Sequence, residues 1–122
     1  METANKTLVM GASTKPERYS NKAIKSLRNH GHETIGVGLR EGQVGDVNIV
    51  KGGEIFDDIH TITIYVGADR LKESEDYILQ LKPERIIFNP GAENPSFAKR
   101  AKEAGIEIVH ACTLVMLATG QY

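Results

Sequence analysis

Cysteine is almost absent from this chain, which has Cys112 alone among 122 residues. A single cysteine excludes an internal disulfide, so the chain is not a disulfide-stabilised scaffold. Tryptophan is missing altogether and proline occurs four times. No apolar run approaches the roughly 20 residues that a membrane-spanning helix requires. The protein must therefore rely on an ordinary hydrophobic core, for which the chain is long enough.

An excess of charge of either sign is also missing. The chain has 15 basic and 16 acidic residues, which gives a formal net charge of -1. Without an overall field, the protein has no general attraction for nucleic acid, anionic membranes or acidic polymers. Any anion site must therefore be local. The first six residues lack the apolar region of a signal peptide, so we expect a cytoplasmic protein.

Patterns for metal binding and for acid–base catalysis are lacking as well. His30, His32 and His60 have no cysteine or glutamate at zinc-type spacing. The acidic residues between positions 38 and 59 do not follow the ligand spacing of calcium or magnesium loops, and turns explain them better. The other carboxylates suit solvated surfaces. We predict no metal site and no catalytic residue.

Short apolar runs alternate with amphipathic helical patterns, which is typical of βαβ units with buried parallel strands. The length fits one domain over residues 1–122. Positions 38–59 are expected to be mostly loop, because roughly eight to ten residues separate the predicted strands there and a parallel crossover needs a dozen or more. The predicted strands are Thr7–Met10, Thr34–Val37, Asn48–Val50, Thr61–Val66, Arg85–Phe88 and Glu107–Val109. The pattern predicts an α/β fold, a three-layer, Rossmann-like, doubly wound parallel sheet of about five to six strands.

Three helices are expected between these strands. The first lies near positions 20–30, with Ser20 as its cap and Gly31 after its last turn. The second carries Leu71, Ser74, Ile78 and Leu81 on one face and ends before Pro83. The third runs from about 95 to 104, where Asn94 can cap, Pro95 suits the first position and Gly105 ends the helix.

The most informative segment follows the first strand, where Gly11 opens a small-residue turn before the first helix. Such a turn exposes backbone amides beside the positive end of the helix dipole, which favours phosphate. The dinucleotide fingerprint fails at Ser13 and Pro16, and the P-loop pattern also fails at Pro16. A strand–loop–helix turn without a ligand remains the alternative. Polar residues that can add donors are Ser13, Thr14, Lys15, Arg18, Ser20 and Asn21.

Small and turn-forming residues also follow three other strands. In doubly wound sheets, ligands bind beyond the carboxyl ends of the strands. After the second strand, an acidic residue suits the ribose of NAD and an arginine suits a phosphorylated ribose. Arg40 therefore favours a phosphorylated ribose, with an exposed, solvated arginine as the alternative. The segments are Gly38-Leu39-Arg40, Gly67-Ala68-Asp69 and Asn89-Pro90-Gly91-Ala92-Glu93.

Several short motifs, spread over nearly the whole chain, resemble the CoA-binding domain family. This family consists of compact proteins similar to the nucleotide-binding domain in the α-subunit of succinyl-CoA synthetase. The motifs that carry the resemblance are Val9-Met10-Gly11-Ala12-Ser13, Pro16-Glu17-Arg18-Tyr19, Leu27 with His30-Gly31-His32, Val37-Gly38-Leu39-Arg40, Phe88-Asn89-Pro90-Gly91-Ala92-Glu93-Asn94-Pro95, Ala104-Gly105-Ile106 and Ala111-Cys112-Thr113.

The resemblance implies a Rossmann-like sheet with coenzyme A lying over the first loop. Arg40 would face the adenosine ribose phosphate, although Gly38-Leu39 replaces the Asn-Pro that often precedes it in the family. Gly67-Ala68-Asp69 also lacks the proline-containing turn of many members. The candidate coenzyme-binding residues are Gly11, Ala12, Ser13, Thr14, Lys15, Arg18, Tyr19, Ser20, Gly38, Arg40, Gly67, Asn89, Pro90, Gly91 and Glu93.

His110 and Cys112 are the one visible pairing of a base with a nucleophile, because alternate residues of an extended segment share a face. Free cysteine is more often a small buried hydrophobe than a reactive thiol, so we predict packing. Exchange of Cys112 with the thiol of coenzyme A remains the alternative.

The functional hypothesis is a binding or sensing module for coenzyme A or acyl-CoA that has no reaction of its own. One alternative is an NAD(P)-binding or CoA-dependent enzyme on the same scaffold. The other is an interaction protein with a vestigial groove, in which the apolar residues Leu114–Leu117 pair subunits. The expected partner is a small nucleotide ligand, and self-association is left open.

Overall fold

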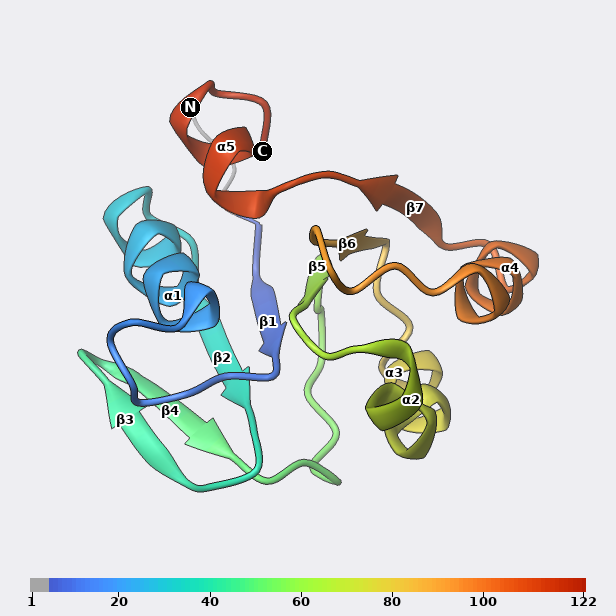
Figure 1. Cartoon of the computed structure of the whole chain (residues 1–122), viewed down its shortest axis with the longest axis horizontal. Coiled ribbons are helices and arrows are strands. Elements are labelled where there is room, and N and C mark those ends of the chain that lie inside the picture. The colour runs from blue at the N-terminus through green and yellow to red at the C-terminus, as the bar shows by residue number, and fades with distance from the viewer. Residues whose placement is uncertain (1–4) are drawn as a thin grey trace.

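Seven strands form one sheet in the order β3-β4-β2-β1-β5-β6-β7 (Figure 1). The structure, a computed structural model, describes residues 5–122. All neighbouring strands are parallel except β3 and β4. The prediction of an α/β, Rossmann-like sheet is confirmed. The strands are β1 (Thr7–Met10), β2 (Thr34–Val37), β3 (Gly42–Val44), β4 (Val47–Val50), β5 (Thr61–Ile64), β6 (Arg85–Phe88) and β7 (Glu107–His110).

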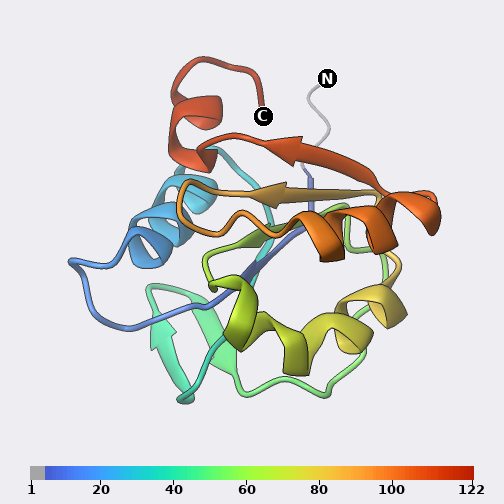
Figure 2. The same ribbon diagram turned by 45° about the vertical axis from the view of Figure 1, so that its right-hand side comes forward.

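Helices cover both faces of the sheet. The helices are α1 (Tyr19–Asn29), α2 (Ala68–Leu71), the 3-10 turn η1 (Lys72–Ser74), α3 (Glu75–Leu81), α4 (Pro95–Glu103) and α5 (Thr113–Ala118). Figures 1 and 2 show α1 with α5 on one side and α2, α3 and α4 on the other. Alternate residues of β1 serve the two cores: Leu8 and Met10 pack toward α2–α4, and Val9 packs toward α1 and α5. Within residues 5–122, no helix has the length and apolarity to cross a membrane.

The order of the strands creates a topological switch point between β1 and β5. From β1 the chain proceeds outward to β2 and β4, and it then returns to the other side of β1 to form β5, β6 and β7 in turn. The six mutually parallel strands end along one margin, here called the carboxyl edge. The loops after β1 and β5 lead to helices on opposite faces of the sheet, and ligands of doubly wound sheets usually bind at such a point.

The region between β2 and β5 differs from the prediction of mostly loop. Residues 42–50 form a hairpin in which β3 pairs antiparallel with β4 at the margin of the sheet, with Gly45 (φ +59°) in the turn. The strand β3 returns the chain across the sheet, so that β4 can run parallel to β2 without a helical crossover. Arg28 on α1 donates two hydrogen bonds to Asp46 in the same turn. The sheet therefore has seven strands instead of five to six.

The helices also differ from the sequence predictions in three respects. Helix α1 begins at Tyr19, and its cap is Arg18 without a side-chain hydrogen bond, so the prediction of Ser20 as the cap is wrong. The expected second helix is divided into α2, η1 and α3, and Lys82 leaves it in the left-handed region (φ 50°) ahead of Pro83. The short helix α5 was not predicted. The cap on α4 is confirmed, because Asn94 accepts a hydrogen bond from the backbone of Phe97.

Tyr65 packs against the core beneath α5, and we expect its burial to make the stability of the protein depend on pH in the alkaline range. Burial raises the pKa of Tyr65 to about 12, and the nearby hydroxyls of Thr113 and Thr63 partly offset this increase. Between about pH 10 and 12 the unfolded state loses the Tyr65 proton and the native state keeps it, so the free energy of unfolding falls over this range and is not reduced by Tyr65 below pH 10. We expect Tyr65→Phe to reduce this loss by about 2 kcal/mol, measured by urea denaturation across that range. Identical profiles for the two proteins would contradict the assignment.

Candidate functional site

The loop after β1 passes close to the end of β5. Gly11 has a φ of +93°, and a Cβ there would lie 2.8 Å from Cγ2 of Val66 and 3.2 Å from the carbonyl carbon of Tyr65. Both the backbone conformation and the close approach require glycine at this position. The loop therefore lies directly at the switch point.

The backbone amides of this loop divide into two groups. Those of Gly11 and Ala12 donate to the carbonyl oxygen of Val37 at 2.8 and 2.9 Å, so they prolong the pairing of β1 with β2. They are not available to a phosphate, which corrects the expectation for Gly11 and Ala12. Among residues 5–122, the amides of Ser13 and Thr14 have no acceptor. The tip of the loop, instead of its beginning, provides the unused donors.

The segment Gly38–Gly42 lies against this loop at both of its ends. A Cβ on Gly38 would be 2.2 Å from the carbonyl oxygen of Ala12, and a Cβ on Gly42 would be 2.6 Å from Cγ2 of Thr14. Arg40 is midway between these two contacts and is exposed. The structure therefore brings Arg40 and the tip of the first loop together at the carboxyl edge.

This part of the edge is rich in cations. Lys15, Arg18 and Arg40 are exposed, and none of them has an ion pair within the described chain. The first turn of α1 contains no acidic residue, and the exposed acidic residues nearest in sequence to these cations are Glu17, before the N-cap, and Glu41, beside Arg40. Tyr19 is 67% exposed, with the Lys22 ammonium 5.1 Å from the centre of its ring. A local excess of positive charge thus exists on a protein that is nearly neutral overall.

The other side of the switch point is less positive. An open hollow there is lined by Gly67, Ala68, Asp69 and Arg70. In the loop after β6, the Glu93 carboxylate accepts two hydrogen bonds from the amide of Gly91, at 3.1 and 3.2 Å. The backbone amides of Glu93 and Gly91 hold the pKa of the Glu93 carboxyl below its usual value. Asp69 and Arg70 in the hollow and Glu93 in the next loop are all exposed, so this side has no excess of positive charge.

Asn89 does not lie where the sequence prediction put it. Its side chain is 2% exposed, and all of its hydrogen-bonding groups face inward. The amide nitrogen donates to Oγ1 of Thr63 at 2.6 Å and to the carbonyl of Ile64 at 2.9 Å, and the amide oxygen accepts from the backbone of Thr113 at 2.8 Å. Asn89 therefore joins β5, β6 and α5 and offers no atom to a ligand, whereas Pro90, Gly91 and Glu93 are exposed.

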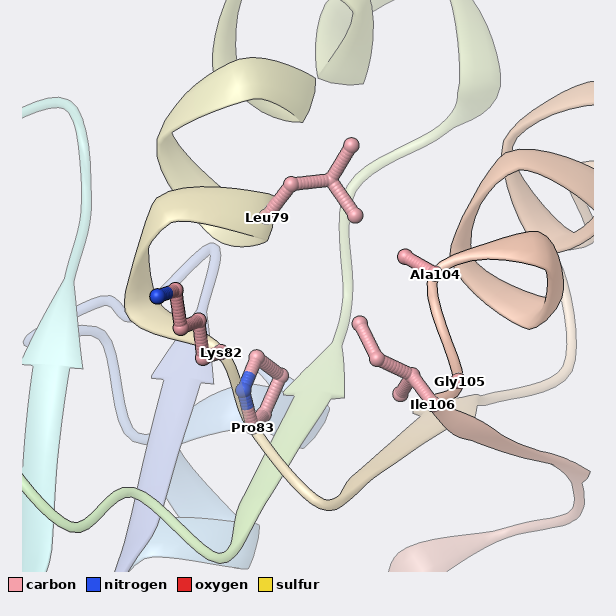
Figure 3. A pocket seen from close by; sticks show the side chains of 6 residues that line it. All are labelled: Leu79, Lys82, Pro83, Ala104, Gly105 and Ile106. Carbon is pink, nitrogen blue, oxygen red and sulfur yellow. The ribbon is translucent and has the colours of Figure 1, made fainter.

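A second hollow lies at the opposite edge of the sheet, where α3 and α4 end (Figure 3). Figure 3 shows Leu79 and Ile106 pointing toward one another across it, while the Lys82 ammonium points away. The carboxyl ends of two helices carry partial negative charge and disfavour an anion. The carboxyl edge of the sheet is therefore the more favourable of the two edges for an anion.

His110 is the last residue of β7, and Cys112 follows two positions later at the carboxyl edge. The His110 ring stacks on Phe88, with 5.5 Å between ring centres. Cys112 is half-buried in the N-cap position of α5, and no hydrogen bond joins it to His110 in the described part of the chain.

Comparison with known proteins decides the family. Residues 5–118 match the model of the CoA binding domain family. The chain belongs to this family. The resemblance inferred from the sequence motifs is therefore confirmed. No curated protein matches the chain.

Solved structures of similar proteins support the same fold for this CoA binding domain. One uncharacterized protein is 40% identical, with a TM-score of 0.96, and the match covers 99% of this chain and 100% of the other. A hypothetical protein from Pyrococcus horikoshii OT3 is 25% identical, with a TM-score of 0.86 over 95% and 83% of the two chains. A dinucleotide forming acetyl-coenzyme A synthetase from Ca. Korarchaeum cryptofilum, solved with phosphate and ADP, is 13% identical, with a TM-score of 0.72. The match covers 88% of this chain and 26% of the synthetase, and it shows the fold alone.

Sequence reasoning placed Asn21 among side chains that could reach a ligand and did not recognise its position in the loop structure. Asn21 is 1% exposed and donates a hydrogen bond from its amide nitrogen to the carbonyl oxygen of Ser13 at 2.9 Å. The sequence does contain a signal for this burial, because Asn21 lies on the same face of the amphipathic helix as the apolar residues Ala23, Ile24 and Leu27. Such a residue is buried with its helix and must find a partner there.

Proposed function

We propose that this protein binds coenzyme A or acyl-CoA at the carboxyl edge of its sheet and acts as a cytoplasmic binding or sensing module without a reaction of its own. The observation that carries the proposal is the joint position of the unused Ser13 and Thr14 amides and the exposed Arg40. Membership of the CoA binding domain family supports the choice of ligand.

The distribution of charge suggests how the ligand lies. The diphosphate would be held by the amides of Ser13 and Thr14, the start of α1 and the side chains of Lys15 and Arg18. Arg40 would pair with the phosphate on the adenosine ribose. The uncharged pantetheine arm would extend toward Gly67 and the exposed residues Pro90, Gly91 and Glu93, where there is no excess of positive charge.

The test compares coenzyme A with dephospho-CoA by isothermal titration calorimetry. A charged hydrogen bond to phosphate contributes roughly 1.5–3 kcal/mol, so we expect Arg40→Ala to weaken coenzyme A binding by about 10- to 100-fold. The same variant should bind dephospho-CoA as the unaltered protein does. Lys102→Ala, an exposed cation at the end of α4, is the control and should change neither affinity.

Two results would count against this function. Equal affinity of the unaltered protein for coenzyme A and dephospho-CoA would remove the phosphate partner assigned to Arg40. Absence of binding for either compound at millimolar concentration would reject the proposal as a whole.

A further inference from the structure

A buried amide in the first turn of α1 has one hydrogen-bonding group satisfied and one unsatisfied. The amide nitrogen of Asn21 donates to the carbonyl oxygen of Ser13, eight residues earlier, at 2.9 Å. The amide oxygen Oδ1 has no donor among the residues that the structure describes. The side chain is 1% exposed and is directed at the loop that contains the unused amides.

An incompletely satisfied amide is a poor choice for stability alone. Burial of a polar atom without a partner is unfavourable, and an apolar side chain of similar size would avoid that cost. The positions that follow on the same buried face of α1 are apolar, namely Ala23, Ile24 and Leu27. The bond to Ser13 is therefore the feature that distinguishes Asn21 from its neighbours.

The geometry of the peptide bond shows what this hydrogen bond does. In a trans peptide, the carbonyl of one residue and the N–H of the next point in opposite directions. The Ser13 carbonyl is directed toward Asn21 on α1, so the amide of Thr14 must point away from Asn21. The Thr14 amide is one of the donors without an acceptor in the described chain.

We propose that Asn21 is a positioning residue that fixes the Ser13–Thr14 peptide so that the Thr14 amide is aimed at a phosphate or diphosphate group. The inference rests on the proposed function and identifies the part of the protein that prepares the anion site before the ligand arrives. Asn21 itself does not contact the ligand. Its effect passes through the orientation of one peptide plane.

Two variants of Asn21 test the proposal. Asn21→Asp keeps the shape, cannot donate to the Ser13 carbonyl and introduces negative charge beside the anion site, so coenzyme A affinity should fall by about 30-fold or more. Asn21→Ala removes the hydrogen bond without adding charge and should weaken binding by about tenfold. Asn29→Asp introduces the same change at an exposed position on the far end of α1 and should leave affinity unaltered.

Nuclear magnetic resonance separates positioning from simple stability. Inorganic pyrophosphate and coenzyme A are titrated separately into each labelled protein well below its melting temperature, and the Thr14 amide signal is followed. We expect a downfield shift of this signal in the unaltered protein and in Asn29→Asp, and a shift of less than half that size in Asn21→Ala. A structural role alone would lower the melting temperature and leave this shift unchanged.

The outcomes distinguish the two proposals. If folded Asn21→Ala and Asn21→Asp bind coenzyme A as tightly as the unaltered protein, the positioning role is wrong. If the unaltered protein does not bind coenzyme A but pyrophosphate still shifts Thr14 in an Asn21-dependent way, the positioning role holds and the coenzyme assignment fails. If neither compound shifts Thr14 in the unaltered protein, the anion site itself is rejected.

Discussion

Gly38→Ala is expected to destabilise the protein by about 3–4 kcal/mol, at or above the upper end of the usual cost of overpacking. The added Cβ would lie 2.2 Å from the carbonyl oxygen of Ala12, 3.2 Å from its carbonyl carbon and 3.3 Å from Cγ2 of Ile49. The first two of these atoms belong to the backbone, which cannot yield by rotating a side chain. Either the segment after β2 or the loop after β1 must move.

Urea denaturation monitored by circular dichroism measures this effect, with Gly67→Ala as the matched control. No atom lies within 4 Å of a Cβ at Gly67, and its φ of -65° suits any residue. Because the loss of the N-cap glycine of α2 and the reduced entropy of the unfolded chain oppose one another, the control should change the free energy of unfolding by less than about 1 kcal/mol. If Gly38→Ala is as stable as this control, the two segments are not in contact as described.

Asn89→Ala should cost about 3 kcal/mol of stability, the second largest effect expected. The substitution removes three hydrogen bonds and leaves the backbone amide of Thr113 buried without its acceptor. Since that amide belongs to the first residue of α5, we expect the substitution to increase the rate of amide hydrogen exchange more in α5 than in β1. Asn48→Ala, an exposed position on β4, is the control and should be nearly neutral.

Calorimetric unfolding and amide hydrogen exchange together test the role of Asn89. A loss of stability with no selective exchange in α5 would show that the contact with Thr113 is not what Asn89 contributes. An unchanged melting temperature would show that the buried hydrogen bonds are replaceable.

Most of the sheet was predictable because its central strands are buried on both faces. The apolar runs at Thr7–Met10, Thr34–Val37 and Arg85–Phe88 coincide with β1, β2 and β6. The missed strand β3 has the sequence Gly-Gln-Val, which carries little intrinsic preference for a strand. It forms because β4 offers a free margin for pairing, and that contact is not visible in a short window of sequence.

The sequence directs attention to the carboxyl edge of the sheet, but it does not show which atoms there are free to meet a ligand. The motif around Gly11 indicates the loop after β1 as the candidate, yet only the register of β1 against β2 shows that the Val37 carbonyl accepts hydrogen bonds from the first two amides of that loop. Asn89 follows a strand as a ligand-binding residue would. It turns inward because Thr63 and Thr113, 26 and 24 positions away, supply its partners.

The hairpin β3–β4 supports the segment around Arg40 separately from the loop after β1. Gly42 is both the first residue of β3 and the residue that contacts Thr14, so the course of the chain through Arg40 depends on this hairpin. The hairpin lies at the margin of the sheet and is joined to α1 by the hydrogen bonds between Arg28 and Asp46. The tip of the first loop depends instead on α1 itself. If the protein binds coenzyme A as proposed, a change in the turn of this hairpin would alter the affinity for the ribose phosphate and leave the contacts of Ser13 and Thr14 with the diphosphate unchanged.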